Sequence, residues 1–289
     1  MRIQVTNDDG IESEGIHVLA RALAATGHEV VVVAPDSNWS GAGAALGDFD
    51  PRQPLAVRRV EVPGAPDIEA WSLAGPPALT VMASFLGAFG DPPDLVVSGI
   101  NAGHNTGRSV LHSGTVGAAL TAQNLGCSGL AVSTGTSAPW YWETAAEVAV
   151  EVLDLIIAAP RRSVLNLNVP ACPRAEVGGI RWARLAPFGA VRAAVASASE
   201  EQIEFTLEAT EERPGPDTDQ GCLDLGYASL TTLVGVVEAW PDGDLSIAEI
   251  AVVDARLTPG ADLHPVHGVP DASEHRFLRR PRLGETIAR

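Results

Sequence analysis

The sequence contains no lysine, because all 19 of its basic residues are arginine. This excludes a Schiff-base lysine, a P-loop lysine and any other catalytic lysine. Positive charge is scarce in general: 36 acidic residues against 19 basic ones give a formal net charge of −17. A field of that sign repels phosphate backbones, so we expect no nucleic-acid polymer as a partner.

Cysteine and long apolar segments are also scarce. The three cysteines, Cys127, Cys172 and Cys222, lie far apart and form no CxxC pair. Their spacing indicates neither a disulfide framework nor a thiolate zinc site, and it fits a reducing cytoplasm. No apolar run approaches the ~20 residues that cross a bilayer, and the N-terminus enters a strand without a basic and apolar leader. We therefore expect a cytoplasmic protein without a membrane partner.

The composition that remains is typical of a globular protein, with 46% hydrophobic residues in a chain of 289. Unbroken apolar runs at 29–35 and 94–100 predict parallel strands that are covered on both faces. The other elements expected before residue 170 are strands at 2–6, 129–134 and 163–169, a peripheral antiparallel pair at 55–62 and 68–73, and helices near 16–23, 78–88, 115–125 and 141–158. This alternation predicts an α/β fold with a doubly wound, mostly parallel, Rossmann-like sheet.

After Pro170 the pattern changes. Three segments, at 180–186, 191–197 and 202–208, alternate between apolar and polar residues like the strands of a hairpin, and 226–233 reads as one more strand. A polar loop is expected at 211–221, before this last strand. The predicted division is a catalytic core, a β-hairpin extension with a returning strand, and a C-terminal arm with little periodicity: residues 1–178, 179–240 and 241–289.

Polar residues follow three of the predicted strands, in the segments TNDDG at 6–10, APDSNWSG at 34–41 and the Gly- and Asn-rich stretch at 98–117. Ligands of doubly wound sheets bind beyond the carboxyl ends of the strands, so we expect the three segments to meet. The oxygen donors that they offer are Asp8, Asp9, Ser40, Asn101 and Asn105. Such an all-oxygen set suits Mg²⁺, Mn²⁺ or Ca²⁺ better than zinc, and a cation would offset the repulsion between the two adjacent aspartates.

Each of these segments also has a plainer interpretation. The two aspartates and the glycine after them could form a turn and cap the next helix. Ser40 could be an ordinary loop serine, and Asn101 and Asn105 could occupy left-handed backbone angles beside glycines. The segment HSGTVG at 112–117 places small and hydroxyl side chains where a helix starts. That is an anion site if its N–H groups are free, and otherwise an ordinary Ser/Thr cap.

Taken together, these residues resemble the SurE family of survival-protein nucleotidases. That family carries a first strand ending in TNDDGI, an APD…SG loop and the pattern SGIN-x-G-x-N-x-G…SGTVGAA, which appear here at 6–11, 34–41 and 98–119. Weaker similarity continues through LNLNVP at 165–170 and GYASLTTL at 226–233. The resemblance therefore covers about residues 1–235.

The resemblance implies a phosphatase that uses one divalent cation, Mg²⁺ or Mn²⁺, to hydrolyse nucleoside monophosphates, with Ca²⁺ as a possible occupant in crystals. It carries metal ligands over onto Asp8, Asp9, Ser40 and Asn101, and phosphate contacts onto Asn105, Ser113, Gly114 and Thr115. The substrate would be a small phosphomonoester. The family also tends to assemble through its C-terminal hairpin and arm, which implies a homodimer or homotetramer.

The chemistry of the residues agrees with this function. A cation beside the aspartates would polarise a phosphoryl oxygen and activate water, and N–H groups near 113–115 would hold the phosphate. Asp8 and Asp9 are therefore the candidate catalytic residues, with Asp9 proposed for proton transfer. Arg108 could neutralise phosphate or be a solvated loop residue. His104 and His112 could act as acid or base, or pack within the loop.

The sequence departs from the SurE pattern at several positions. GPPALT at 75–80 stands in place of the family's GTPADC, and Thr121 replaces an acidic residue. Ser37 and Trp39 occupy positions that are usually basic. None of these changes removes a proposed ligand, and they bear on substrate preference and on contacts between subunits. A phosphatase specialised for another small phosphomonoester is therefore an alternative.

Other phosphatase families and unrelated nucleotide-binding folds fit less well. A haloacid-dehalogenase-like enzyme needs D-x-D after its first strand and a catalytic lysine, and calcineurin-like enzymes need GD-x-H and GNH clusters. A nucleoside hydrolase needs D-x-D-x-x-x-DD. The run GAGAALG at 41–47 follows the wrong strand for a dinucleotide fingerprint. The non-enzymatic alternative is a metal-dependent phosphate- or nucleotide-binding module.

Overall fold

The structure of the protein is a computed structural model that describes residues 1–48, 50, 52–135, 138–187, 191–198, 202–209 and 213–236. Met1–Gly235 form one compact unit. The predicted arm at 241–289 lies outside the described residues. The boundary that the sequence places between residues 178 and 179 stays a prediction.

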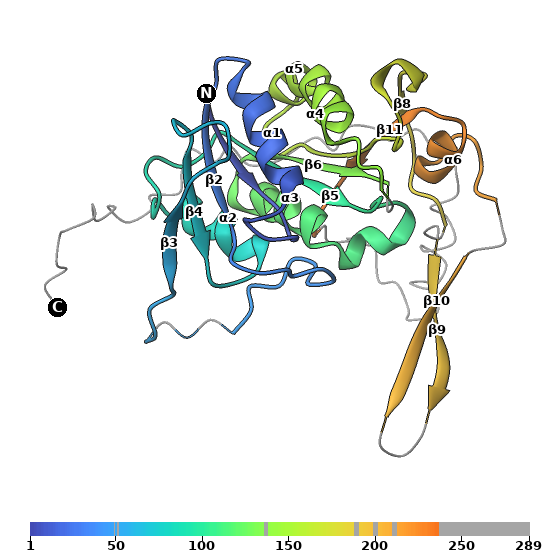
Figure 1. The fold of residues 1–289 in the computed structure, drawn as a ribbon, viewed down its shortest axis with the longest axis horizontal. Helices are drawn as coiled ribbons and strands as arrows, with labels where there is room; N and C mark the ends of the chain where they lie inside the picture. The colour runs from blue at the N-terminus through green and yellow to red at the C-terminus, as the bar shows by residue number, and fades with distance from the viewer. Residues whose placement is uncertain are drawn as a thin grey trace, which may run out of the picture. The chain divides into compact units, whose positions relative to one another are not determined.

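Within the described residues, nine strands form one sheet in the order β3-β4-β2-β1-β5-β6-β7-β11-β8 (Figure 1). Its central strands are β1 (Arg2–Thr6), β2 (Glu29–Pro35), β5 (Leu95–Ala102), β6 (Ser128–Thr134) and β7 (Val164–Asn168). All neighbours in this central group are parallel. The doubly wound, mostly parallel sheet expected from the sequence is therefore confirmed.

The central strands are buried on both faces, as β2 illustrates. Val30 and Val32 pack into the largest hydrophobic cluster, whereas Val31 and Val33 pack into a second one. Successive side chains of a strand point to opposite faces, so an unbroken apolar run is what two covered faces require. This is why the run at 29–35 predicts the bounds of β2 correctly.

Helices cover both faces of the sheet. On one face, α1 (Glu14–Ala24) contacts β1, β2 and β5, and it packs against α4 (Trp142–Glu151), which is followed by α5 (Leu153–Ala158). On the other face, α2 (Pro77–Phe85) packs against α3 (Gly114–Leu125). The single helix predicted at 141–158 is thus divided in two, and the one predicted at 78–88 ends earlier. Among the described residues, no helix is long and apolar enough to span a membrane.

Antiparallel strands lie at both edges of the sheet. β3 (Val57–Val60) pairs with β4 (Glu69–Leu73), which confirms the predicted peripheral pair. At the opposite edge, β11 (Ala228–Leu233) runs antiparallel to β7, and β8 (Ile180–Trp182) runs parallel to β11.

The hairpin extension differs from its prediction. β9 (Val191–Ala198) and β10 (Ile203–Ala209) form a separate two-stranded antiparallel sheet. The segment at 180–186 was expected to join this hairpin, but only Ile180–Trp182 is a strand, and it joins the large sheet. Alternation of apolar and polar residues identifies a strand but carries no information about its partner.

Short helices complete the described unit. They are η1 (Gly107–His112), η2 (Arg174–Glu176) and α6 (Asp219–Asp224). The α6 helix begins within the segment 211–221, where a polar loop was expected. Its N-cap is Thr218, whose hydroxyl accepts a hydrogen bond of 3.1 Å from the N–H of Gly221. This is an ordinary Ser/Thr N-cap.

Candidate functional site

The polar segments named above lie at the switch point of the sheet. From β1 the chain builds outward through β2 and β4, and it then returns to place β5 on the other side of β1. Ligands of doubly wound sheets bind at such a reversal. Asp8 and Asp9 follow β1. Asn101 is the last but one residue of β5, and it pairs with β6 after a shift in the register of these two strands. Asn101 is therefore a strand residue, whereas the sequence placed it in a loop.

Asp8 is the residue at which three segments meet. Its Oδ1 accepts a hydrogen bond of 2.5 Å from the hydroxyl of Thr115 in α3. Its backbone carbonyl accepts one of 2.7 Å from the N–H of Trp39, in the turn after β2. Gly114 lies so close that a Cβ added to it would be 2.7 Å from the Cβ of Asp8 and 2.8 Å from its Oδ2. A side chain at Gly114 would therefore displace the carboxylate.

Asp9 is half-buried, and its carboxylate contacts neutral donors. The Asn38 amide donates to Oδ1 at 3.4 Å, and the N–H of Ala102 donates to Oδ2 at 3.4 Å. Burial raises the pKa of Asp9, and the charge of Asp8 raises it further, while the bond from Ala102 lowers it. A bound cation would relieve both of the effects that raise this pKa.

The turn after β1 is held by a side chain of its own. Asn7 Nδ2 donates to the carbonyl of Gly10 at 2.9 Å and to the hydroxyl of Ser13 at 2.7 Å. Gly10 has φ +96°, which glycine adopts without strain. The turn considered in the plainer interpretation is thus present. The cap is not, because the N-cap residue of α1 is Ser13 rather than either aspartate.

The two neutral oxygen donors predicted for a cation differ in their surroundings. Asn101 donates through Nδ2 to the carbonyl of Gly103 at 2.7 Å, which leaves its Oδ1 as a possible ligand. Ser40 is exposed, and its N–H bonds to Asn38 Oδ1 at 2.8 Å. Among the hydrogen bonds of the described residues, none joins the Ser40 hydroxyl to either aspartate.

The donor set fits a hard divalent cation. The described residues contain no group of three or more His, Cys, Asp or Glu side chains that could hold a metal ion. A cation here would rest on the carboxylates of Asp8 and Asp9, supplemented by amide or hydroxyl oxygens and by water. Mg²⁺ is usually bound in this way, through one or two carboxylates, several waters and substrate phosphate.

The start of α3 is where the sequence predicts an anion site, and that assignment stays a prediction. Ser113 is the N-cap, and its Oγ accepts a hydrogen bond of 3.1 Å from the N–H of Val116. The Ser/Thr cap considered as an alternative is therefore present. The first N–H groups of a helix have no partner inside the helix and carry the positive end of its dipole. Because Gly114 contacts the Asp8 carboxylate, this helix terminus faces the aspartates.

Asn105 is held in place by residues for which the sequence suggested no role. Its N–H donates to Asn168 Oδ1 at 2.7 Å, and its Nδ2 donates to the hydroxyl of Ser133 at 2.9 Å. Its carbonyl accepts from the amides of Asn166 and Asn168 at 2.8 and 3.0 Å. All three partners are fully buried. The signal in the sequence was the N-L-N pattern, which puts two amides on one face of β7.

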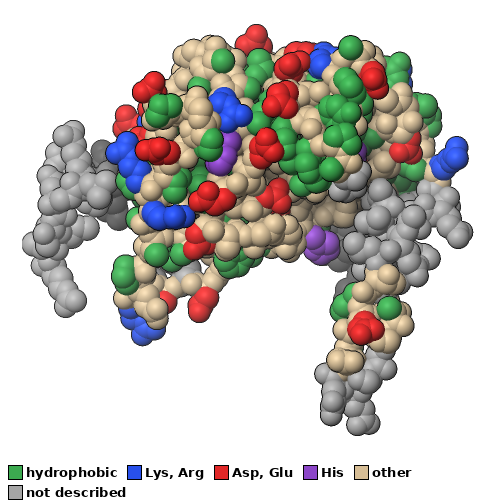
Figure 2. Space-filling view, viewed as in Figure 1, with side chains coloured by type: hydrophobic (Ala, Val, Ile, Leu, Met, Phe, Trp, Pro, Cys, Tyr) green, Lys and Arg blue, Asp and Glu red, His purple; other side chains and the backbone are tan. Residues whose placement is uncertain are grey.

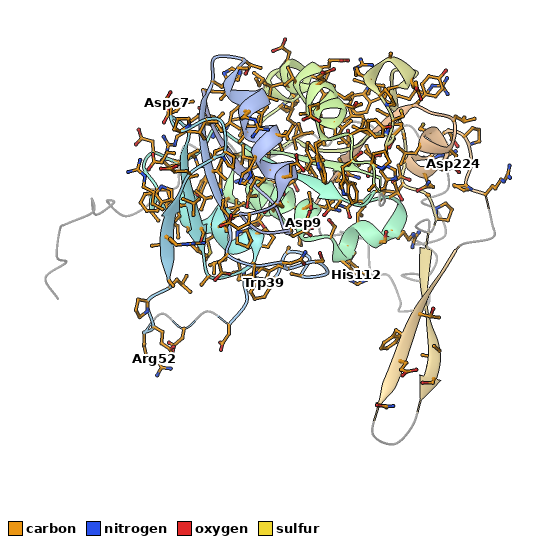
Figure 3. The ribbon with its side chains drawn as sticks, viewed as in Figure 1. Asp9, Trp39, Arg52, Asp67, His112 and Asp224 are labelled. Atoms are coloured by element: carbon orange, nitrogen blue, oxygen red, sulfur yellow. The ribbon has the colours of Figure 1, made fainter. Side chains whose placement is uncertain are left out.

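The ionisable residues that follow β5 differ in their exposure to solvent. Arg108 and His112 are exposed on η1. His104 is not free, because its Nε2 lies 3.0 Å from the carbonyl of Val169 and burial lowers its pKa. Figure 3 shows Asp9 close to the loops that carry Trp39 and His112, and a hydrogen bond of 3.1 Å from Gly43 N–H to His112 O joins those two loops. Acidic side chains are spread over the face shown in Figure 2.

Comparisons with known proteins identify the family of the chain. A family model described as Survival protein SurE matches residues 3–189. The chain belongs to the SurE family. The resemblance stated from its motifs is therefore confirmed.

Named relatives and a solved structure extend the match. The 5'-nucleotidase SurE of Stenotrophomonas maltophilia is 38% identical over 240 residues, which are 81% of this chain and 89% of the relative. The 5'-nucleotidase SurE of Synechococcus sp. (strain CC9605) is 40% identical over 187 residues, 64% of this chain and 68% of the relative. A crystal structure of the SurE protein from Aquifex aeolicus superposes with a TM-score of 0.69 at 29% identity, covering 89% of this chain and 99% of that one.

Proposed function

We propose that the protein is a phosphatase that depends on a divalent metal ion and hydrolyses nucleoside monophosphates. The observation that carries the proposal is the adjacent pair Asp8 and Asp9, which is contacted by the turn after β2, the end of β5 and the start of α3. The SurE relatives named as 5'-nucleotidases support the substrate class.

The metal ligands proposed are Asp8, Asp9, Asn101 and Ser40, with Mg²⁺ or Mn²⁺ as the occupant. A divalent cation held there supplies Lewis-acid polarisation of a phosphoryl oxygen and a lowered pKa for a bound water. The two carboxylates contribute the negative charge that selects a cation. Asn101 Oδ1 is available because the amide nitrogen is already bonded to Gly103.

The phosphate group would lie at the start of α3. The N–H groups of Gly114 and Thr115 lie at the positive end of the helix dipole and would donate hydrogen bonds to the phosphate. Their positions are fixed before the reaction starts. Ser113 and the amide of Asn105 would add donors at the rim. The sequence contains no lysine, so these neutral donors would replace the lysine that binds phosphate in many other proteins.

Asp9 is the candidate for taking up the proton of the attacking water. Within the described residues, its half-buried carboxylate accepts only long hydrogen bonds of 3.4 Å, from the Asn38 amide and from the N–H of Ala102, so it could accept a further one from water. Asp8 is less suited to this role, because its Oδ1 already accepts a hydrogen bond from the Thr115 hydroxyl.

The test is release of inorganic phosphate from AMP and from p-nitrophenyl phosphate in the presence of Mn²⁺, with EDTA as the control. We expect turnover by the wild type, none in EDTA, and a loss of at least ~100-fold in Asp9→Asn with its fold retained. Asp36→Asn, at an exposed aspartate after β2, is the matched control and should keep activity.

Other results would favour the alternatives. Nucleotide binding without turnover by the wild type would indicate a binding module. Turnover of other phosphate esters but not of nucleotides would indicate a specialised phosphatase. Normal activity in a folded Asp9→Asn protein would contradict the site assignment.

We further propose that the protein forms a homodimer or homotetramer through its hairpin. Phe205 lies opposite Val195 in the pairing of β9 with β10, and their exposed fractions are 70% and 59%. Ile203, also on this hairpin, is 59% exposed. Light scattering should therefore show an assembly that Phe205→Ser weakens, and a monomeric wild type would contradict the proposal.

A further inference from the structure

Trp39 is joined to the candidate site through its backbone. Its N–H donates to the carbonyl of Asp8 at 2.7 Å, and its own carbonyl accepts from the N–H of Ala42 at 3.0 Å. The preceding residue, Asn38, donates to the carboxylate of Asp9. The backbone of Trp39 is thus fixed next to both aspartates.

The surface that this ring offers is apolar. Trp39 is half-buried, and its indole nitrogen Nε1 is buried without a hydrogen-bond partner among the described residues. Because Nε1 is the only polar atom of the side chain, the exposed part of the indole consists of carbon and hydrogen. Such a surface favours contact with a flat apolar or aromatic group over contact with a hydroxyl or an anion.

A second apolar side chain lies on the neighbouring loop. The turn that contains Trp39 packs against the end of η1, where a Cβ added to Gly43 would be 2.9 Å from the carbonyl of Leu111. The side chain of Leu111 is 74% exposed. Figure 3 shows the labelled Trp39 and His112 on these two loops near Asp9.

The charge of these loops argues against a second anionic group on the substrate. Residues 36–48 contain no arginine, and η1 carries one, Arg108. The net charge of the chain is −17. A further phosphate or carboxylate would therefore meet a repulsive field with little local compensation. An uncharged planar group meets no such cost.

We propose that Trp39 determines substrate specificity by stacking on the nucleobase of a nucleoside monophosphate, with Leu111 beside it. This rests on the proposed phosphatase function and specifies its substrate class. Stacking of a base on an aromatic side chain corresponds to a roughly 5- to 100-fold effect on binding. A purely structural Trp39 would instead affect every phosphomonoester to the same extent.

The experiment compares AMP with ribose 5-phosphate, which has the same sugar and phosphate but no base. In Trp39→Ala, kcat/KM for AMP should fall by roughly 5- to 100-fold, mainly through KM, while ribose 5-phosphate changes by less than about 2-fold. Trp39→Phe keeps an aromatic ring and should retain most of the activity on AMP. Trp182→Ala, at a tryptophan that is 60% exposed on β8, is the control and should alter neither substrate.

Equal losses for both substrates, or no loss for AMP, would overturn the proposal. Calorimetry with adenosine separates it from the proposed function, because adenosine has no phosphate to hydrolyse. If the wild type binds adenosine at least 5-fold more tightly than Trp39→Ala but hydrolyses no ester, the inference holds and the phosphatase assignment fails. If the wild type turns over AMP while Trp39→Ala binds adenosine equally well, the inference fails and the phosphatase assignment stands. A wild type that binds neither adenosine nor AMP overturns both.

Discussion

The hydroxyl of Thr115 donates a hydrogen bond of 2.5 Å to Oδ1 of Asp8. Both residues are buried, with exposed fractions of 0% and 3%. The bond joins the first turn of α3 to the turn after β1, so the segment that carries the candidate anion site is fixed to the segment that carries the candidate cation site. A phosphate and a metal ion bound there would have a set geometry before substrate arrives.

Replacing Thr115 tests this link. Thr115→Val keeps the shape of the side chain and removes the donor, so the buried carboxylate of Asp8 loses a partner. We expect a loss of about 1–3 kcal/mol in the free energy of unfolding and a fall of about 10-fold or more in kcat/KM. Thr121→Val, which removes a 2.7 Å bond to Gly117 O in the same helix, is the control for activity. Wild-type turnover in Thr115→Val would show that the link is dispensable.

Gly114 tests the close approach of α3 to Asp8. In Gly114→Ala, the added methyl group would lie 2.7 Å from the Cβ of Asp8, well inside van der Waals contact. The helix start or the aspartate must shift, and a shift of that size can cost roughly 100-fold in rate. Phosphate release and Mn²⁺ affinity should both decline. Unchanged values for both would mean that the approach does not matter for the site.

Replacing Asp219 tests a connection between α6 and the residues Gly107 and Ala186, which the sequence did not indicate. Its fully buried carboxylate accepts hydrogen bonds from the N–H groups of Gly107, Ala186 and Gln220, at 2.8, 2.9 and 2.8 Å. Asp219→Ala leaves two buried donors and a partly buried one without an acceptor, so we expect a loss of about 3 kcal/mol or more in the free energy of unfolding, measured by urea denaturation. Asp224→Ala, on the exposed side of α6, should cost far less. Similar losses for the two variants would refute this role.

The burial of His104 leads to a prediction of how the free energy of unfolding depends on pH. Burial lowers its pKa, so at acid pH the unfolded chain takes up a proton that the folded chain refuses. Stability should therefore fall as pH drops below about 6.5 toward the lowered pKa, by at most about 1.4 kcal/mol per pH unit for one group. The pKa of His17 is also lowered, so His104→Gln should remove only part of this slope. Denaturation at pH 7.5 and 5.5 measures it, and an unchanged slope in His104→Gln would contradict the assignment.

Local signals predicted the central fold well and its periphery less well. The run at 29–35 predicted β2 because two covered faces demand unbroken apolar residues. The segment at 180–186 was assigned to the wrong sheet, since strand pairing is a non-local property. The α6 helix was missed because six residues are too few to show helical periodicity, although the Thr218 cap was visible in the sequence.

The candidate site shows the same division. Convergence of Asp8 and Asp9 with the turn after β2 and the start of α3 could be expected, because the carboxyl ends of parallel strands share an edge. The hydrogen bond from the hydroxyl of Thr115 to Asp8 could not be expected, because the sequence indicated only that N–H groups near 113–115 could hold a phosphate. The direction of a side chain depends on packing between segments, and the sequence does not encode it locally. The buried amides that hold Asn105 were missed for the same reason.

The central claim is that Asp8 and Asp9 together hold one divalent cation. Isothermal titration of the metal-stripped protein with Mn²⁺ tests it most directly, in the wild type and in Asp8→Asn and Asp9→Asn. The account predicts one ion bound per chain in the wild type and an affinity at least ~100-fold weaker in either variant, since each loses a charged ligand. A wild type that binds no Mn²⁺, or variants that bind it as tightly as the wild type, would contradict the claim.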